Sequence, residues 1–171
     1  MTSLIITGGR KRIDDVRAYI RALASIGSDY GVTVQALNAD TISGRGHIEF
    51  AVAKAEESFD SGRNLARDLG VEIMLYLRGR RQIERALDMG VRPGENNVAI
   101  AIIGERAVEA LPAVQTTLLD TVDESVIDYT YEKDQLLMKL FEITPAELEI
   151  VGRDRVPELV RERSALLEFE K

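Results

Sequence analysis

Short apolar segments typical of strands alternate with amphipathic helical segments through the first two thirds of the chain, and this alternation favours the α/β class of folds. Each apolar segment is bounded by glycine or polar residues. The predicted strands are Leu4–Thr7, Val32–Leu37, Val71–Leu77 and Val98–Ile103. The predicted helices are Ile13–Gly27, Ile48–Phe59 and Arg80–Met89, with Ile83, Ala86 and Leu87 pointing inward in the last of them.

Beyond Gly104 the pattern changes to helices. Leu136, Leu137, Leu140 and Phe141 form an apolar stripe, and Thr144-Pro145-Ala146-Glu147 has the residue order of a capping box that begins a helix. We therefore expect a mixed α/β fold: a small central sheet of about four strands flanked by helices, with a helical C-terminal part.

Charge divides the chain at the same point. Residues 120–171 carry 14 acidic and seven basic side chains, whereas residues 1–119 have no net charge. We expect a single domain over residues 1–171, with an α/β portion at 1–119 and an acidic helical portion at 120–171. A uniformly basic nucleic-acid binder is excluded, but a local basic patch on the first portion is not.

Composition removes several classes of protein. The 171 residues include no cysteine and one histidine, so disulfides, thiol catalysis and the usual zinc sites are excluded. No apolar run approaches the roughly 20 residues of a membrane span, and no secretory signal is evident. No catalytic triad can be assembled. We expect a cytoplasmic, non-catalytic protein that needs no metal and no cofactor and does not enter membranes.

The segment Gly8-Gly9-Arg10-Lys11-Arg12 lies where a phosphate-binding loop would lie, between a predicted strand and a predicted helix. It has neither the GxGxxG spacing nor the GK[ST] ending of such loops. We interpret it as a solvated surface loop.

Two other segments combine glycine and basic residues at a predicted helix start: Gly44-Arg45-Gly46-His47 and Arg78-Gly79-Arg80-Arg81-Gln82-Ile83. Free backbone N–H groups at a helix start favour an anion. Alternatively, the second segment begins a helix with internal ion pairs, such as Arg80–Glu84 and Arg85–Asp88, whose spare arginines meet acids elsewhere in the fold. The residues alone leave both readings open.

Three motifs in the same order and spacing resemble the KEOPS subunit family of the PRPK-binding protein (TPRKB), in its archaeal branch. They are Gly44-x-x-His47 with Phe50-Ala51, Gly79-Arg80-Arg81-Gln82-Ile83 with Ala86, and Ile143-Thr144-Pro145-Ala146-Glu147-Leu148-Glu149. The similarity extends from about Val34 to the C-terminus. Arg78 departs from the pattern, because a small hydroxylated residue is expected before the glycine.

The resemblance implies a non-catalytic subunit. Such subunits bind the small kinase-like ATPase subunit of KEOPS and help recruit tRNA, including its single-stranded 3′ CCA end. A separate catalytic subunit places threonylcarbamoyl on the adenosine beside the anticodon.

On this reading, Arg78, Arg80 and Arg81 would contact phosphates of the tRNA end together with the helix N-terminus. Gln82 would read a base edge, and His47 and Arg45 would stack on a splayed base or contact the ribose. For Gln82 and His47, a purely structural role at a helix start is the alternative.

The terminal helices carry the predicted kinase-binding residues, Leu159, Val160, Arg163, Leu166 and Leu167. Packing against the protein's own core would produce the same stripe. Two other functions stay open: a domain that binds a nucleotide or phosphorylated metabolite at the two glycine-containing segments, and a purely structural interaction module.

Overall fold

The computed structural model describes residues 3–170, which form two compact units. The first, which we call the sheet unit, comprises the chain up to Ala39 together with Gly90–Ile127. The second, which we call the helical unit, comprises Asp40–Met89 and the chain from Asp128 onward. Each unit is therefore built from two separate stretches of the chain. The expectation of a single domain stays a prediction.

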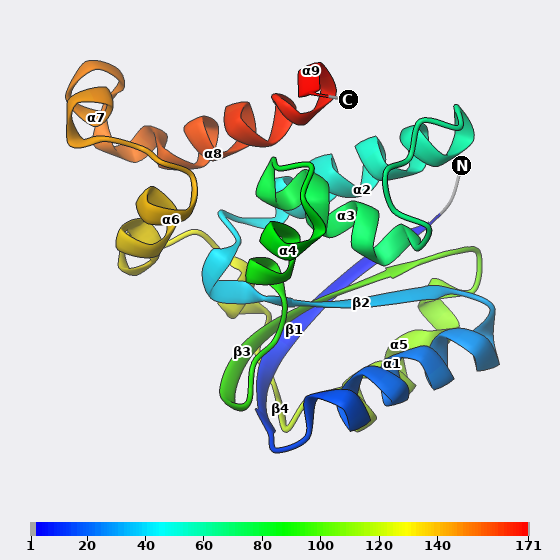
Figure 1. Cartoon of the computed structure of the whole chain (residues 1–171). Coiled ribbons are helices and arrows are strands. Elements are labelled where there is room, and N and C mark those ends of the chain that lie inside the picture. The colour runs from blue at the N-terminus through cyan, green and yellow to red at the C-terminus, as the bar shows by residue number, and fades with distance from the viewer. Residues whose placement is uncertain (1–2, 171) are drawn as a thin grey trace. The chain divides into compact units, whose positions relative to one another are not determined.

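Four antiparallel strands form one sheet in the order β2-β3-β1-β4 (Figure 1). The strands are β1 (Leu4–Ile13), β2 (Thr33–Asn38), β3 (Gly94–Ile103) and β4 (Thr121–Val122). The two ten-residue strands β1 and β3 pair along their whole length, from Leu4 opposite Ile103 to Ile13 opposite Gly94.

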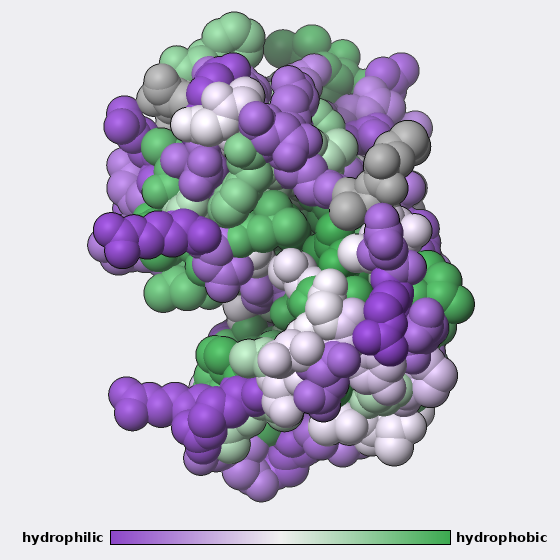
Figure 2. Space-filling model, turned by 90° about the vertical axis from the view of Figure 1, so that its right-hand side faces the viewer, coloured by the Kyte–Doolittle hydropathy of each residue, from purple (hydrophilic) through white to green (hydrophobic). Residues whose placement is uncertain are grey.

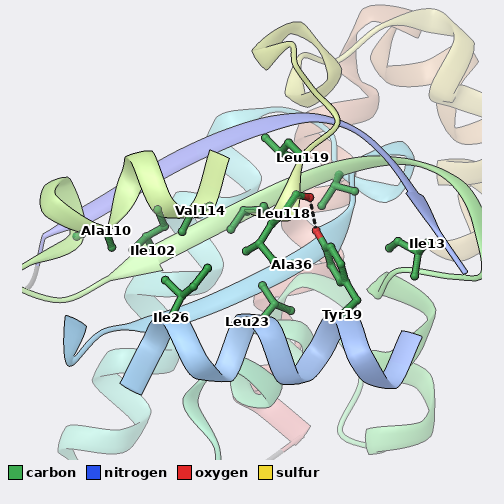
Figure 3. Packing of buried hydrophobic residues seen from close by; sticks show 13 residues of the cluster. Ile13, Tyr19, Leu23, Ile26, Ala36, Ile102, Ala110, Val114, Leu118 and Leu119 are labelled. Atoms are coloured by element: carbon green, nitrogen blue, oxygen red, sulfur yellow. Dashed lines mark hydrogen bonds between the residues drawn. The ribbon is translucent and has the colours of Figure 1, made fainter. Parts of the chain in front are cut away.

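Helices α1 (Val16–Tyr30) and α5 (Ala107–Leu118) pack side by side on one face of this sheet (Figure 3). Their inward side chains, with those of the strands, form the core of the sheet unit. One polar group lies within it: the Tyr19 hydroxyl donates a hydrogen bond of 2.9 Å to the Leu118 carbonyl at the end of α5. Burial raises the pKa of Tyr19, which keeps the phenol protonated as the donor.

The basic segment after Thr7 is not a loop, and that prediction is wrong. Residues 8–12 continue β1. A Cβ atom on Gly9 would lie 1.9 Å from the Thr121 carbonyl oxygen, so this glycine permits the close approach of β4 rather than a turn.

The three basic side chains of this segment are each paired with acids of the sheet unit. The pairs are Arg10–Asp123, Lys11–Asp120, Arg12–Asp14 and Arg12–Glu95, at 3.1 to 3.3 Å. Because these charges are already neutralised, they fit the interpretation of a surface patch without a ligand.

The helical unit contains the 16-residue helix α2, several shorter helices and single helical turns (Figure 1). The helices are α2 (Arg45–Asp60), α3 (Leu69–Arg78), α4 (Ile83–Ala86), α6 (Asp134–Leu140), α7 (Pro145–Val151), α8 (Val156–Ala165) and α9 (Leu167–Glu170). The 3-10 turns of the chain are Ala39–Thr41, Leu87–Met89, Glu124–Ile127, Tyr131–Lys133 and Arg153–Arg155.

The segment Val71–Leu77 was predicted as a strand but forms most of α3, so that prediction is wrong. Its burial was predicted correctly, since Ile73, Leu75 and Leu77 have no exposed surface. Asp68 caps the start of the helix by accepting a hydrogen bond from the Gly70 N–H. A helix that is apolar around its circumference has the same sequence pattern as a strand buried on both faces.

The helix predicted over Arg80–Met89 is much shorter. Only Ile83–Ala86 is α-helical, followed by a 3-10 turn, and Arg80–Gln82 precede it as a non-helical connection. Ala86 is buried as predicted, but Ile83 and Leu87 are 47% and 61% exposed rather than inward. Four residues make too short a helix for a strong terminal dipole, so the helix N-terminus contributes little to an anion site at this point.

The predicted capping box is confirmed. Thr144 accepts a hydrogen bond from the Glu147 N–H, and the Glu147 side chain accepts one from the Thr144 N–H. The predicted fold class is confirmed as well: a mixed α/β fold with a four-stranded sheet, associated helices and a helical C-terminal segment. Among the helices of residues 3–170, none has the length and apolar character needed to cross a membrane.

Candidate nucleic-acid interface

The motifs that carry the family resemblance meet in the helical unit at two adjacent residues of α8, Arg163 and Ser164. The first motif reaches Ser164 through His47. The second reaches the Arg163 carbonyl through Gly79, and the third reaches the Arg163 guanidinium through Glu147. Motifs that are far apart in sequence therefore lie against the same place on α8.

His47 is buried, with 1% of its surface exposed. Gly44 begins α2, and the His47 ring turns back so that Nδ1 accepts a hydrogen bond from the Ser43 N–H at 3.2 Å. Nε2 then carries the proton and donates to the Leu77 carbonyl at 2.9 Å. The Ser164 hydroxyl donates to the same carbonyl at 3.0 Å. His47 thus joins the start of α2 to the end of α3 and to α8.

Burial lowers the pKa of His47 to about 4, and the charges of Arg161 and Lys133 act in the same direction. The ring is therefore neutral at physiological pH. Its contacts are those expected if this residue has a structural role, and stacking of His47 on a base stays a prediction.

Gly79 ends α3 with a left-handed φ of +71°. A Cβ atom at this position would lie 2.5 Å from the Arg163 carbonyl oxygen, well inside contact distance. Only glycine satisfies both the conformation and the close approach of α8. The glycine fixes the point at which the following arginines leave α3.

Arg78 is the last residue of α3, and its side chain is only 6% exposed. The guanidinium carbon lies 5.8 Å from the centre of the Phe141 ring, and Nε lies 3.5 Å from the Asp88 carboxylate. The same Phe141 ring makes a T-shaped contact with the His47 ring, at 5.8 Å between ring centres. Burial, followed by the charge of Arg80, lowers the pKa of Arg78.

The next three residues extend toward solvent. Arg80 is partly exposed and forms an ion pair of 2.7 Å with Glu142. Arg81 and Gln82 are exposed. The Gln82 side chain makes no capping hydrogen bond to α4, and no residue between 3 and 170 forms an ion pair with Arg81. Arg45, at the first position of α2, is exposed as well.

The arginines do not use the acidic partners closest in sequence. Arg80 pairs with Glu142 instead of Glu84, and Asp88 pairs with Arg78 instead of Arg85. Glu142 belongs to the acidic C-terminal third, where the second of the two readings expects such partners. Part of the positive charge of this segment is therefore neutralised by an acid that is distant in sequence.

The third motif is fastened to α8. The Arg163 Nη2 donates to both oxygens of Glu147 at 2.7 and 2.6 Å, and Nε donates to the Phe141 carbonyl at 3.2 Å. These bonds, with the Thr144 cap, lower the pKa of Glu147 and keep it charged.

The predicted kinase-binding residues lie at different depths. Val160 and Leu167 have no exposed surface, and Leu159 is 6% exposed. Arg163 is half-buried and bound to Glu147. Leu166 alone of the five offers a large apolar side chain to solvent, at 49% exposure.

Further apolar side chains reach the surface, and Figure 2 shows hydrophobic residues among hydrophilic ones over the face in view. In the C-terminal helices these include Ile150, 85% exposed, and Phe169, 87% exposed. Sequence reasoning missed them, as it missed Glu142 and Ser164. Which residues of an amphipathic helix are exposed depends on how the helix is rotated about its axis, and the structure is needed to determine that rotation.

No group of three or more histidine and acidic side chains among the described residues is placed to hold a metal ion. The arrangement offers instead a set of buried polar contacts beside an exposed basic segment. Such an arrangement is suited to binding an anion by hydrogen bonds and charge.

Comparison with known proteins gives consistent matches. The family model of the kinase binding protein CGI-121 matches residues 13–166. The chain is 28% identical over 142 residues to the regulatory protein Cgi121 of Methanocaldococcus jannaschii. The aligned residues cover 82% of this chain and 87% of that protein. A stretch of 62 residues is 42% identical to the KEOPS complex subunit Cgi121 of Pyrococcus abyssi, covering 34% of this chain and 36% of that one.

These matches confirm the resemblance found in the sequence motifs. The match to the family model spans nearly all of the chain, including the elements that carry Gly44, His47, Gly79 and Glu147. The chain belongs to the family of the kinase binding protein CGI-121.

Proposed function

We propose that this chain is a non-catalytic regulatory subunit of KEOPS that binds the kinase-like ATPase subunit and recruits tRNA by its 3′ CCA end. Family membership supports the kinase-binding part, as do relatives named as a regulatory protein and a KEOPS subunit. Threonylcarbamoylation of the adenosine beside the anticodon would be carried out by another subunit. No metal or cofactor enters this function.

The observation that carries the tRNA part is the exposed pair Arg81 and Gln82, which begins two residues after Gly79, where α3 packs closely against α8. Arg81 offers a guanidinium to a phosphate, and Gln82 offers a donor and an acceptor to a base edge. Because single-stranded ends present both groups to solvent, a short exposed segment of this kind suits the CCA end.

The other predicted contacts fall into two groups. Arg45 and Arg80 reach solvent and would add charge to the contact with the RNA backbone. Arg78 and His47 are buried and touch the same Phe141 ring, so in this arrangement they position the segment from below. A direct contact of either with RNA would require the overlying residues to move.

Reversing the charge of Arg81 tests this site. We expect Arg81→Glu to weaken tRNA binding by at least about tenfold, because it removes one phosphate contact and adds repulsion. Binding of labelled tRNA, with and without the 3′ CCA, measures the effect. Removal of CCA should weaken wild-type binding strongly and affect the variant little.

The matched control is Arg17→Glu, the same reversal at an exposed arginine of α1 in the sheet unit. Equal losses in both variants would reduce the effect to net charge and refute the site. A chain that binds one nucleotide tightly and ignores tRNA would support the metabolite-binding alternative instead.

The kinase-binding surface includes Leu166 in this proposal, because the other predicted leucine and valine side chains are occupied in the core of the helical unit. We expect Leu166→Glu to weaken binding to the kinase-like subunit by about tenfold or more, since it would place an unpaired negative charge in an apolar contact. Titration of the purified subunits by calorimetry measures this effect.

Val108→Glu is the control for this experiment. Val108 is 64% exposed on α5 in the sheet unit, so the substitution has the same chemistry at another surface. Unchanged affinity in Leu166→Glu, with the fold intact by circular dichroism, would exclude Leu166 from the interface.

A further inference from the structure

Two arginines of the proposed RNA site are already bound to carboxylates of the chain itself. The Glu142 Oε2 lies 2.7 Å from the Arg80 Nη2, and the Asp88 Oδ2 lies 3.5 Å from the Arg78 Nε. Both acids face solvent, with side chains 76% and 42% exposed. Arg81, which lies in the same segment, has no ion pair with any residue from 3 to 170.

Glu142 occupies a backbone position that favours glycine. It follows the end of α6 with a φ of +53°, and the Ile143 N–H donates to the Met138 carbonyl at 2.9 Å, which closes a left-handed helix end. A residue other than glycine is disfavoured there by about 1 kcal/mol. The glutamate side chain at this unfavourable position is the one that pairs with Arg80.

Arg78 lacks acceptors. Its Nε and Nη1 are buried and form no hydrogen bond with any described residue, and the contact with Asp88 exceeds ordinary hydrogen-bond distances. Buried donors without an acceptor are unfavourable, and a charged one is more so. The buried guanidinium is thus held by one long contact to an exposed carboxylate, and another anion takes that place only once Asp88 has moved aside.

We propose that Asp88 and Glu142 act as internal competitors of phosphate, holding Arg78 and Arg80 in the free protein and releasing them when a chain of phosphates binds. For RNA as the ligand, this inference rests on the function proposed above. A lone phosphate that displaces one carboxylate gains little, because it exchanges one ion pair for another. Adjacent phosphates that also reach the unpaired Arg81 gain a new contact, so the competition favours a polyanionic strand over mononucleotides.

The test replaces each carboxylate by an uncharged amide of nearly the same shape. We expect Glu142→Gln and Asp88→Asn each to tighten binding by about two- to fivefold, the range that corresponds to exposed ion pairs. Glu149→Gln, at an exposed acid of α7, is the control for the change in net charge. The ligands are tRNA with an intact CCA end and inorganic tripolyphosphate, each titrated at fixed salt.

A double variant identifies the contact responsible. In an Arg80→Gln background, Glu142→Gln should give no gain, whereas Asp88→Asn should retain its gain. This result would show that Glu142 acts through Arg80 and not through the general field of the protein.

The possible results separate the two proposals. If tRNA binds wild type and every acid-to-amide variant equally, the competition is refuted while the tRNA function stands. If tRNA fails to bind but tripolyphosphate binds Glu142→Gln more tightly than Glu149→Gln, the competition stands and the tRNA function fails. If neither ligand binds any of the proteins, both are refuted.

Discussion

Substitution of Gly79 by alanine is expected to lower the free energy of unfolding by about 3 kcal/mol or more. Two costs add. The left-handed backbone at φ +71° disfavours any side chain, and the added Cβ would lie 2.5 Å from the Arg163 carbonyl oxygen. Since both groups are backbone or fixed to it, α8 would have to move. Urea unfolding followed by circular dichroism measures the loss.

Gly62 provides a control that separates the two costs. Its φ is +70°, nearly the same as that of Gly79, but a Cβ there would have no neighbour within 4 Å. Gly62→Ala should therefore cost only the backbone contribution, about 1 kcal/mol. Equal losses at the two glycines would mean that α8 does not approach Gly79 as closely as the structure has it.

Acidification is expected to destabilise the protein through His47 alone before the carboxylates respond. The folded pKa of about 4 lies below the ordinary 6.5 of histidine, so the unfolded chain takes up the proton first. The stability that the neutral His47 ring contributes is fully present above pH 6.5 and is lost as the pH falls toward 4. Between pH 7 and pH 5 the free energy of unfolding should fall by about 2 kcal/mol from this group.

His47→Gln tests the assignment, because His47 is the only histidine in the chain. The variant loses the ring's hydrogen bonds and should be less stable at neutral pH, but its stability should hardly change between pH 7 and pH 5. Glu147, with a lowered pKa, keeps its charge over that range and responds only at more acidic pH. The same pH dependence in wild type and variant would rule out His47 as the titrating group.

Most of the sheet was predictable from the sequence. The strands near Leu4, Val34 and Ile100 are apolar and bounded by glycine or polar residues, and the structure has strands at all of these places. The fourth strand, Thr121–Val122, has only two exposed residues, so it has no burial pattern by which sequence could identify it.

The apolar segment Val71–Leu77 shows what periodicity cannot decide. Every position from Ile73 to Leu77 is buried, and a continuous apolar run has no period. Its boundaries carried the missing information. Asp68 is an N-cap and Gly79 a left-handed C-terminal residue, two signals typical of a helix and not of a strand.

The candidate site was predictable in its residues but not in their exposure. The sequence singled out Arg78 and Arg80 together, yet one is buried against Phe141 and the other reaches solvent. Glu142, the acidic partner of Arg80, is 62 positions from it along the chain. Pairings at that separation depend on how α6 and α3 pack, and local spacing contains no information about this.

The two-part composition of the helical unit sets the order in which it can assemble. The Leu77 carbonyl at the end of α3 and the Ser164 hydroxyl that donates to it are 87 positions apart, with the whole of the sheet unit's second stretch between them. During synthesis, the apolar surface of α3 leaves the ribosome long before α8 exists to cover it. Contacts between such distant positions are slow to form. Until they form, the exposed apolar surface of α3 makes the chain prone to aggregate. Shortened versions of this protein that end before α8 should therefore accumulate in the insoluble fraction, however well their strands pair.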